Sequence, residues 1–170
     1  MGVDKATLPI AGTSLLDLMH KKLQHAGFEK VVICRNAPNC LSDEIPDKGP
    51  IGALYTLSRH YPEQQALIIP VDMPLLHATS LQKLGKASDA RQSPSTPVPM
   101  TFAGQILPLL LPFTPCVIRA LDTQIKQAND LSIAAFLRTT NAEHIPAPED
   151  KAQFFNSNTP EQWADILARF

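Results

Sequence analysis

Residues 66–72, Ala-Leu-Ile-Ile-Pro-Val-Asp, join an apolar run to a single carboxylate, and Pro74 turns the chain just beyond it. An apolar run of this length without polar alternation is typical of a strand buried on both faces of a sheet. In open α/β sheets, ligands bind outside the carboxyl ends of the strands. The stretch therefore predicts a buried strand over residues 66–71, with Asp72 at an edge where a ligand can bind.

The residues before this run predict an alternation of helices and strands. Residues 14–26 place Leu15, Leu16, Met19 and Leu23 on one helical face, and Gly27 suits the left-handed position past the helix end. Residues 30–34, Lys-Val-Val-Ile-Cys, predict another strand buried on both faces, and residues 51–60 predict a helix. Helix, strand, helix and strand at this spacing indicate βαβ units and an open α/β sheet.

The second half of the chain continues with shorter elements and a polar loop. The loop, residues 88–99, is rich in proline and serine and fits either a cover over a site or a spacer. The remaining predicted elements are hairpin strands over 98–102 and 106–111, helices over 113–127 and 131–138, and a last helix that begins at Thr159-Pro160.

The composition narrows the class of protein. A chain of 170 residues fits one domain, and its net charge of −1 gives no electrostatic case for binding nucleic acid or an anionic membrane. No apolar run approaches the roughly 20 residues that a spanning helix needs. The first residues lack the pattern of a secretory signal, and the three cysteines and five histidines show no metal-binding spacing. We therefore expect a cytoplasmic, single-domain protein.

Asp72 and Lys5 are the charged candidates for a site. Mg²⁺ prefers one or two carboxylates together with phosphate oxygens and water, so Asp72 can hold such a cation; alternatively it only caps a turn. Lys5 can act as a point charge on transferring phosphates, or it is a solvated surface lysine. The positions of these two residues in the sequence do not decide between a functional role and an ordinary structural one for either residue.

Two further segments offer backbone or amide groups. The turn Gly49-Pro50-Ile51-Gly52 enters a helix whose first amides can face an anion or a base, although Gly-Pro is also an ordinary loop signal. Asn156 and Asn158 project to the same side of an extended stretch, where they can bind a substrate or simply cap the following helix. These segments are candidates for substrate binding.

Four segments in order carry a resemblance to a known family. They are Met1-Gly2-Val3-Asp4-Lys5, Gly49-Pro50-Ile51-Gly52, residues 70–76 (Pro-Val-Asp-Met-Pro-Leu-Leu) and residues 154–161 (Phe-Phe-Asn-Ser-Asn-Thr-Pro-Glu). Together they resemble the motifs of the MobA-like nucleotidyltransferases, the molybdenum-cofactor guanylyltransferases above all. The resemblance covers the chain to about residue 168. It implies a Rossmann-like α/β fold with an open, mostly parallel sheet and helices on both faces.

The resemblance also implies a reaction: Mg²⁺-dependent transfer of GMP from GTP to molybdopterin, the molybdenum cofactor. It further implies contacts with other cofactor-biosynthesis proteins and with molybdoenzyme apoproteins. The implied roles are GTP phosphate contact for Lys5, nucleotide binding for Asn36 and Asp43, Mg²⁺ and nucleotide binding for Asp72, substrate contact for Gly49 and Gly52, and a place in the site, on the molybdopterin side, for Asn156 and Asn158. Lys5 and Asp72 are the catalytic candidates.

The sequence departs from the family at its beginning. The family's glycine-rich loop, whose amides surround the triphosphate, and the first strand of its sheet would both lie before Met1. Two hypotheses follow: Met1 is an internal methionine of a longer chain, or this is a shortened, non-catalytic relative that acts as a binding module. Weak or no GTP binding is expected for residues 1–170. Another nucleotidyltransferase of this fold, using CTP or a sugar-phosphate acceptor, is the remaining alternative.

Overall fold

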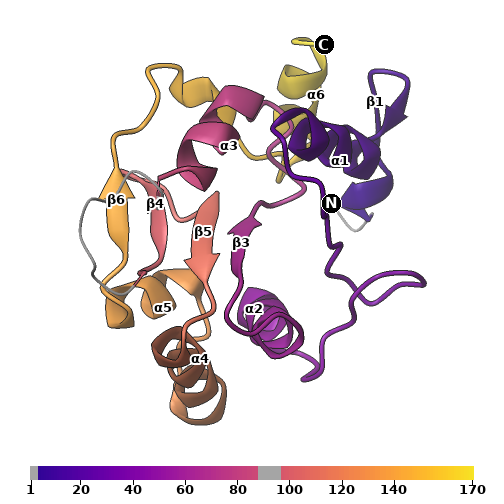
Figure 1. Ribbon diagram of the computed structural model, residues 1–170. Helices are drawn as coiled ribbons and strands as arrows, with labels where there is room; N and C mark the ends of the chain where they lie inside the picture. The colour runs from indigo at the N-terminus through magenta and orange to yellow at the C-terminus, as the bar shows by residue number, and fades with distance from the viewer. Residues whose placement is uncertain (1–3, 88–96) are drawn as a thin grey trace.

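The computed structural model describes residues 4–87 and 97–170, and Figure 1 shows how their elements are arranged. The helices are α1 (Leu15–His25), α2 (Gly49–His60), α3 (Ala78–Gly85), α4 (Pro115–Gln127), α5 (Ile133–Thr139) and α6 (Pro160–Leu167). The strands are β1 (Pro9–Ile10), β2 (Thr13–Ser14), β3 (Gln65–Ile68), β4 (Met100–Phe102), β5 (Leu109–Pro112) and β6 (Glu143–Ile145). Two 3-10 helices, η1 (Lys5–Thr7) and η2 (Lys151–Phe154), complete the order.

The central sheet has the strand order β3-β5-β4-β6. β5 runs antiparallel to both β3 and β4, whereas β4 and β6 are parallel. β3, β4 and β6 therefore point in one direction, and β5 alone in this sheet points in the other. The segments that follow β3 and β6 consequently leave the sheet at the same end of the strands. β1 and β2 form a separate short hairpin ahead of α1.

Helices cover both faces of the sheet. Side chains of β5 alternate, so that Leu110 joins the buried cluster containing residues of α1, α3 and α6, while Leu109 and Leu111 join the cluster of α2, α4 and α5. Figure 1 shows these two groups of helices on opposite sides of the strands. The predicted open α/β fold with helices on both faces is confirmed. No helix in the described ranges is long and apolar enough to cross a membrane.

Several predicted elements are confirmed with their caps. α1 begins after Ser14, whose side chain accepts a hydrogen bond from the Asp17 amide, and Gly27 past its end has a φ of +88°. β4 and β5 form the predicted antiparallel hairpin around Gly104. Thr114, Ser132 and Thr159 cap α4, α5 and α6 in the same way as Ser14 caps α1. The predicted cap at Thr159 is confirmed, whereas the caps of α4 and α5 lie inside the ranges that were predicted to be helical.

The predicted strand over residues 30–34 is wrong. Residues 30–33 have no regular structure and pair with no described strand, and the only bridge in this segment joins Cys34 to Leu41 in the loop that follows. Valine and isoleucine favour strands, but a strand forms only where a neighbour supplies the ladder of hydrogen bonds. The side chains of Val31 to Cys34 are consequently half-buried rather than fully enclosed.

The other differences concern element lengths and elements that were not predicted. β3 ends at Ile68 instead of residue 71, before Pro70, which has no amide hydrogen for a ladder. α3 and β6 were not predicted; α3 is short and has no side-chain cap, although it buries Leu81 and Leu84. Of the predicted polar loop, residues 88–96 lie outside the described part, and residues 97–99 have no regular structure.

Candidate functional site

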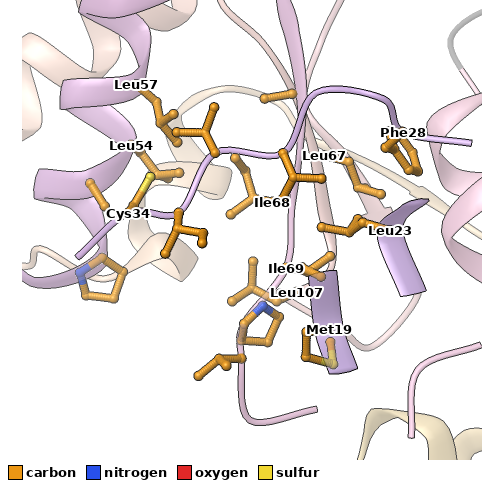
Figure 2. A pocket seen from close by; sticks show the side chains of 18 of the residues that line it. Met19, Leu23, Phe28, Cys34, Leu54, Leu57, Leu67, Ile68, Ile69 and Leu107 are labelled. Carbon is orange, nitrogen blue, oxygen red and sulfur yellow. The ribbon is translucent and has the colours of Figure 1, made fainter. Parts of the chain in front are cut away.

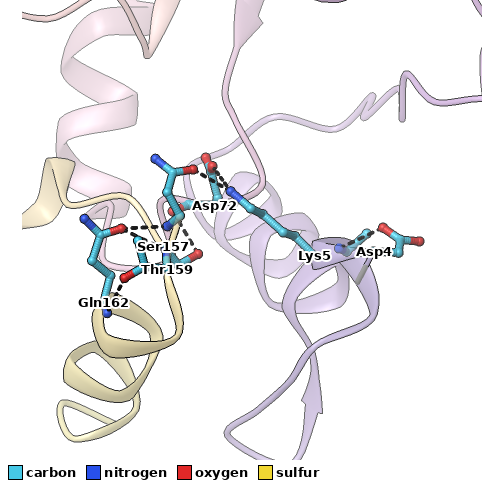
Figure 3. Close-up of polar contacts among 8 residues, drawn as sticks. Asp4, Lys5, Asp72, Ser157, Thr159 and Gln162 are labelled. Carbon is cyan, nitrogen blue, oxygen red and sulfur yellow. Dashed lines mark hydrogen bonds and ion pairs between the residues drawn. The ribbon is translucent and has the colours of Figure 1, made fainter. Parts of the chain in front are cut away.

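A polar cluster joins three segments that lie far apart in the sequence (Figure 3). The Lys5 ammonium donates to Asp72 Oδ2 over 2.8 Å and to Asn158 Oδ1 over 2.6 Å. The Lys5 and Asp72 side chains keep only 26% and 19% of their surface exposed. Partial burial lowers the local dielectric and strengthens their attraction relative to a fully exposed pair. Lys5, Asp72 and Asn158 therefore form one charge-assisted hydrogen-bonded unit.

The short helix η1 holds Lys5 in place. Asp4 caps this helix, because its Oδ1 accepts a hydrogen bond from the Ala6 amide over 3.1 Å. The carbonyl of Lys5 accepts a hydrogen bond from the Leu8 amide. The other carboxylate oxygen of Asp4 forms an ion pair with Arg35. The backbone on both sides of Lys5 is thus fixed while its side chain reaches across to Asp72.

The start of α6 holds Asn158. Thr159 and Gln162 form a capping box, in which each side chain accepts a backbone hydrogen bond from the other residue. The Gln162 Oε1 atom also accepts a 2.8 Å hydrogen bond from the Asn158 amide. Gln162 was not predicted as part of the site, although the Thr-x-x-Gln spacing identifies it as the partner of the helix cap. Its side chain links the asparagine to the rigid first turn of α6.

Ser157 fixes the backbone of Asp72. The Asp72 carbonyl accepts hydrogen bonds from the Ser157 amide over 3.0 Å and from Ser157 Oγ over 3.4 Å. Ser157 is fully buried, and the sequence reading did not select it. The sequence does contain an indication of this burial. Ser157 lies between Asn156 and Asn158, which were expected to project to one side of an extended stretch, so the side chain of the residue between them points to the opposite side. Ser157 brings the segment after β6 against the segment after β3.

Asn156 has an oxygen without a partner. Its Oδ1 atom is buried and accepts no hydrogen bond within the described residues. An unsatisfied buried amide oxygen costs free energy, and most such groups in proteins are paired with protein or water. The Asn156 oxygen is therefore an acceptor for which residues 4–87 and 97–170 supply no donor.

The other four candidates form a second group around the start of α2. Asn36 Oδ1 accepts a 3.1 Å hydrogen bond from the Asp43 amide. Gly49 has a φ of +55°, a conformation that favours glycine. A Cβ atom on Gly52 would lie 3.1 Å from Lys48 Cβ and 3.3 Å from the Ile45 carbonyl oxygen, so the loop before α2 packs closely on this helix. Glycine at both positions allows the loop to fold back over α2.

The two groups are linked through neighbouring residues and make no direct polar contact with each other. The ion pair between Asp4 and Arg35 joins the residues that precede Lys5 and Asn36. Within the ranges that the structure describes, no hydrogen bond or ion pair connects Asn36 or Asp43 directly to Lys5, Asp72 or Asn158. The expected roles of these residues stay predictions.

An apolar cavity of about 620 Å³ lies between residues 30–35 and the strand β3 with its extension to residue 71 (Figure 2). Side chains from α1 and α2, including Met19, Leu23 and Leu54, complete its wall. Asp4 reaches its rim, whereas Lys5 and Asp72 do not line it. The cavity therefore lies beside the polar cluster and is chemically distinct from it.

The cavity wall also determines the chemistry of Cys34. Burial, followed by the nearby charges of Asp43 and Cys40, raises the pKa of the Cys34 thiol to about 11. A thiol with this pKa is almost entirely protonated at neutral pH and is a poor nucleophile. Cys34 therefore does not fit the role of a catalytic thiol.

The described part of the chain contains no cluster of side chains that is typical of a complete metal site. Among residues 4–87 and 97–170, no three side chains of His, Cys, Asp or Glu gather closely enough to hold a metal ion. A cation at Asp72 would need oxygen ligands from amides, water or a bound phosphate, as is usual for Mg²⁺.

Comparisons with known proteins agree on one family. The MobA-like NTP transferase domain family matches residues 1–144. A protein from Xanthomonas euvesicatoria pv. vesicatoria, named molybdenum cofactor guanylyltransferase, is 34% identical over 172 residues, which cover 98% of this chain and 87% of that protein. This degree of identity over nearly the whole chain indicates common descent.

Solved structures show the same fold. Molybdopterin-guanine dinucleotide biosynthesis protein A from Archaeoglobus fulgidus superposes with a TM-score of 0.71 at 17% identity, over 99% of this chain and 93% of that one. The 2-C-methyl-D-erythritol 4-phosphate cytidylyltransferase from Thermus thermophilus superposes with a TM-score of 0.65 at 14% identity, over 98% and 94%. These two structures establish the fold, and the matches over most of the sequence show that the chain belongs to the MobA-like NTP transferase family.

Proposed function

We propose that this protein transfers GMP from GTP to molybdopterin in a Mg²⁺-dependent reaction. The family and the name of the 34% identical relative support a guanylyltransferase. The observation that carries the proposal is the Lys5 ammonium held between Asp72 Oδ2 and Asn158 Oδ1, at 2.8 and 2.6 Å. A cation and a carboxylate placed together where strands end suit the recognition of a metal-bound triphosphate.

The reaction needs no nucleophile from the protein. A terminal phosphate oxygen of molybdopterin attacks the α-phosphorus of GTP, a new phosphorus–oxygen bond forms, and the bond between the α- and β-phosphates breaks. Pyrophosphate leaves with the electron pair of that bond. The protein's task is to align the two substrates and to stabilise the negative charge that builds up on the phosphates.

The residues present fit Mg²⁺. Two oxygens, from Asp72 and Asn158, converge on one point, where the Lys5 ammonium now lies. Mg²⁺ commonly takes one or two protein oxygens and completes its coordination with water and substrate phosphates. A bound Mg²⁺ would supply Lewis-acid polarisation of the phosphates. In our proposal Asp72 holds this ion, and Lys5 turns its ammonium towards the phosphate oxygens.

The remaining residues are assigned to binding. We propose that Asn36 and Asp43, with the turn from Gly49 to Gly52, contact the nucleotide or substrate at the start of α2. Asn156 and Asn158 are assigned to the molybdopterin side. The buried Oδ1 atom of Asn156, which has no partner in the described part of the chain, supports this assignment, because it can accept a hydrogen bond from a ligand N–H or O–H group. We place the activity in the cytoplasm, where the product would pass to molybdoenzyme apoproteins.

The direct test is product formation from GTP labelled at its α-phosphate. The protein is incubated with molybdopterin, Mg²⁺ and millimolar GTP, and a parallel reaction contains CTP. The proposal predicts label in a guanine dinucleotide product and little label transferred from CTP. Equal or better transfer from CTP would reassign the substrate. Absence of transfer from either nucleotide, with GTP binding undetectable at millimolar concentration, would contradict catalysis by this chain.

A further inference from the structure

The turn that follows Asp72 is held in place by a hydrogen bond to the Asp72 carbonyl and by the burial of two apolar side chains. Ser157 donates to the Asp72 carbonyl, as described above. Met73 and Leu76 are buried, and the Leu76 amide donates to the Met73 carbonyl over 3.2 Å. These contacts do not involve the Pro74 and Leu76 carbonyls, which need another hydrogen-bond donor.

Lys22 of α1 supplies that group. Its ammonium donates to the Pro74 carbonyl over 2.5 Å and to the Leu76 carbonyl over 3.0 Å. The two carbonyls are 52 and 54 residues away from Lys22 in the sequence. One side chain on a rigid helix therefore bridges both carbonyls at the C-terminal half of the turn.

The position of Lys22 in α1 is unusual for a lysine. Leu15, Met19 and Ala26 are buried, and residue 22 lies on the same face at helical spacing from them. Burial lowers the pKa of the Lys22 ammonium, which means that this location penalises its charge. The neighbouring Lys21 is exposed. A half-buried ammonium is tolerated here because two carbonyl oxygens replace part of its hydration.

We infer that Lys22 is a positioning residue of the candidate metal site, one that sets the direction of the Asp72 carboxylate by holding the turn behind it. Ser157 fixes the carbonyl of Asp72 on one side, and Lys22 fixes the next part of the backbone on the other. With both sides held, the Asp72 side chain has a defined starting direction toward Lys5 and Asn158. This inference rests on the proposed metal-binding role of Asp72.

The test measures Mn²⁺ affinity, with and without GTP, by electron paramagnetic resonance of the free ion. The variants are Lys22→Met, Lys22→Arg, Asp72→Asn and the matched control Lys21→Met. Groups that orient metal ligands typically contribute about 10- to 100-fold to metal affinity, so Lys22→Met is expected to weaken Mn²⁺ binding by at least about tenfold. Arginine keeps the charge and several donors, so Lys22→Arg should recover most of the affinity. Lys21→Met should bind like the wild type.

Thermal unfolding of each variant separates positioning from stability. A purely structural Lys22 would lower Tm while the folded protein kept its Mn²⁺ affinity, and that outcome overturns the inference. If Lys22→Met does not fold, Lys22→Gln retains a donor for one carbonyl and should show an intermediate loss; wild-type affinity in Lys22→Gln would then overturn the inference.

The Asp72→Asn variant distinguishes the two levels of the proposal. Lost affinity in Asp72→Asn together with wild-type affinity in Lys22→Met rejects the role of Lys22 alone. Wild-type affinity in Asp72→Asn rejects the metal assignment of Asp72 and, with it, the role inferred for Lys22.

Discussion

Lys5 and Asp72 form a 2.8 Å ion pair across 67 residues of sequence, at the edge of the molecule where the segment after β3 leaves the sheet. The pair is partly buried and is extended by Asn158, so one ammonium group links three separate segments, two of which Ser157 also joins through the Asp72 carbonyl. An arrangement that gathers a cation, a carboxylate and an amide oxygen suits a phosphate or metal ligand better than it suits stability, because such pairs contribute little to folding.

Replacing Lys5 with methionine should affect catalysis far more than folding. A partly exposed ion pair is worth at most about 1 kcal/mol, which corresponds to a fall in Tm of roughly 2–4 °C for a chain of this size. Loss of a group that stabilises charge in the transition state typically costs about 100-fold or more in kcat. Steady-state kinetics and thermal unfolding of Lys5→Met measure both effects. The control is Lys126→Met, which removes an exposed lysine on α4. A kcat of Lys5→Met within a factor of a few of wild type would reject the role of this ammonium.

Removing the side chain of Gln162 should loosen Asn158. Gln162→Ala deletes the acceptor of the Asn158 and Thr159 amides, and loss of a helix cap costs about 1 kcal/mol. We expect a fall in Tm of a few degrees and faster hydrogen exchange of the Asn158 amide. GMP transfer should fall as well, because Asn158 holds Lys5. Gln127→Ala at the end of α4 is the matched control. Unchanged exchange at Asn158 would show that the capping box does not restrain it.

Cys34 should be the slowest of the three cysteines to react. With a pKa of about 11, its thiolate fraction at pH 8 is roughly 10⁻³, and alkylation should accelerate about tenfold per pH unit until that pKa is reached. The exposed Cys116 is the internal reference. Peptide mass spectrometry after timed iodoacetamide treatment at pH 7, 8 and 9 gives the rates. Cys34 reacting as fast as Cys116 in the folded protein would contradict its burial.

The same shift has a consequence for stability. The thiol of Cys34 has a higher pKa in the folded state than in the unfolded state, so folding favours its protonated form. The protonated thiol therefore contributes to the free energy of unfolding. This contribution is fully present below pH 9, the pKa of the thiol in the unfolded state, and is lost as the pH rises towards 11. Replacing Cys34 with alanine should therefore flatten the dependence of Tm on pH between these values.

The cavity between residues 30–35 and β3 should bind an apolar dye. A hollow of about 620 Å³ with a mostly apolar wall provides the environment in which anilinonaphthalene sulfonate fluoresces. We expect enhanced fluorescence of this dye at neutral pH and a clear reduction in Val31→Asp, which adds a carboxylate to the wall. Leu167→Asp on α6 changes an exposed leucine elsewhere and serves as control. Equal fluorescence in the two variants would place the dye outside the cavity.

Local chemistry in the sequence predicted most helices, because capping side chains and apolar spacing act within a few residues. Thr159 was expected to cap the last helix, and Ser14 begins the range 14–26 that was predicted to be helical; the hydroxyl group of each accepts a hydrogen bond from the first turn. Strands were harder, since a strand depends on a partner that is distant in the sequence. The contents of β-branched residues are similar in residues 30–34 and in the chain from Gln65 to Val71. Only the latter segment forms a strand that pairs with another, β5.

Three of the predicted site residues lie together in the structure, whereas the residues that hold them in place were not predicted. Lys5, Asp72 and Asn158 were selected from motif resemblance, and the structure brings these three together. Ser157, Gln162 and Lys22 were not selected, because each acts on a backbone group whose position only the folded chain defines. Asn36 and Asp43 bond to each other, and no sequence pattern indicates how far they lie from Asp72.

The measurement that tests the central claim most directly is Mn²⁺ binding in the presence of GTP by wild type, Asp72→Asn and Asp122→Asn. Asp122 is a carboxylate on α4 outside the candidate site and controls for the loss of one negative charge. If Asp72 holds the metal against the triphosphate, Asp72→Asn should weaken Mn²⁺ binding by at least about tenfold, or ~1.4 kcal/mol, while Asp122→Asn binds like wild type. Equal affinity in all three proteins would contradict the assignment of Asp72, and with it the proposed site.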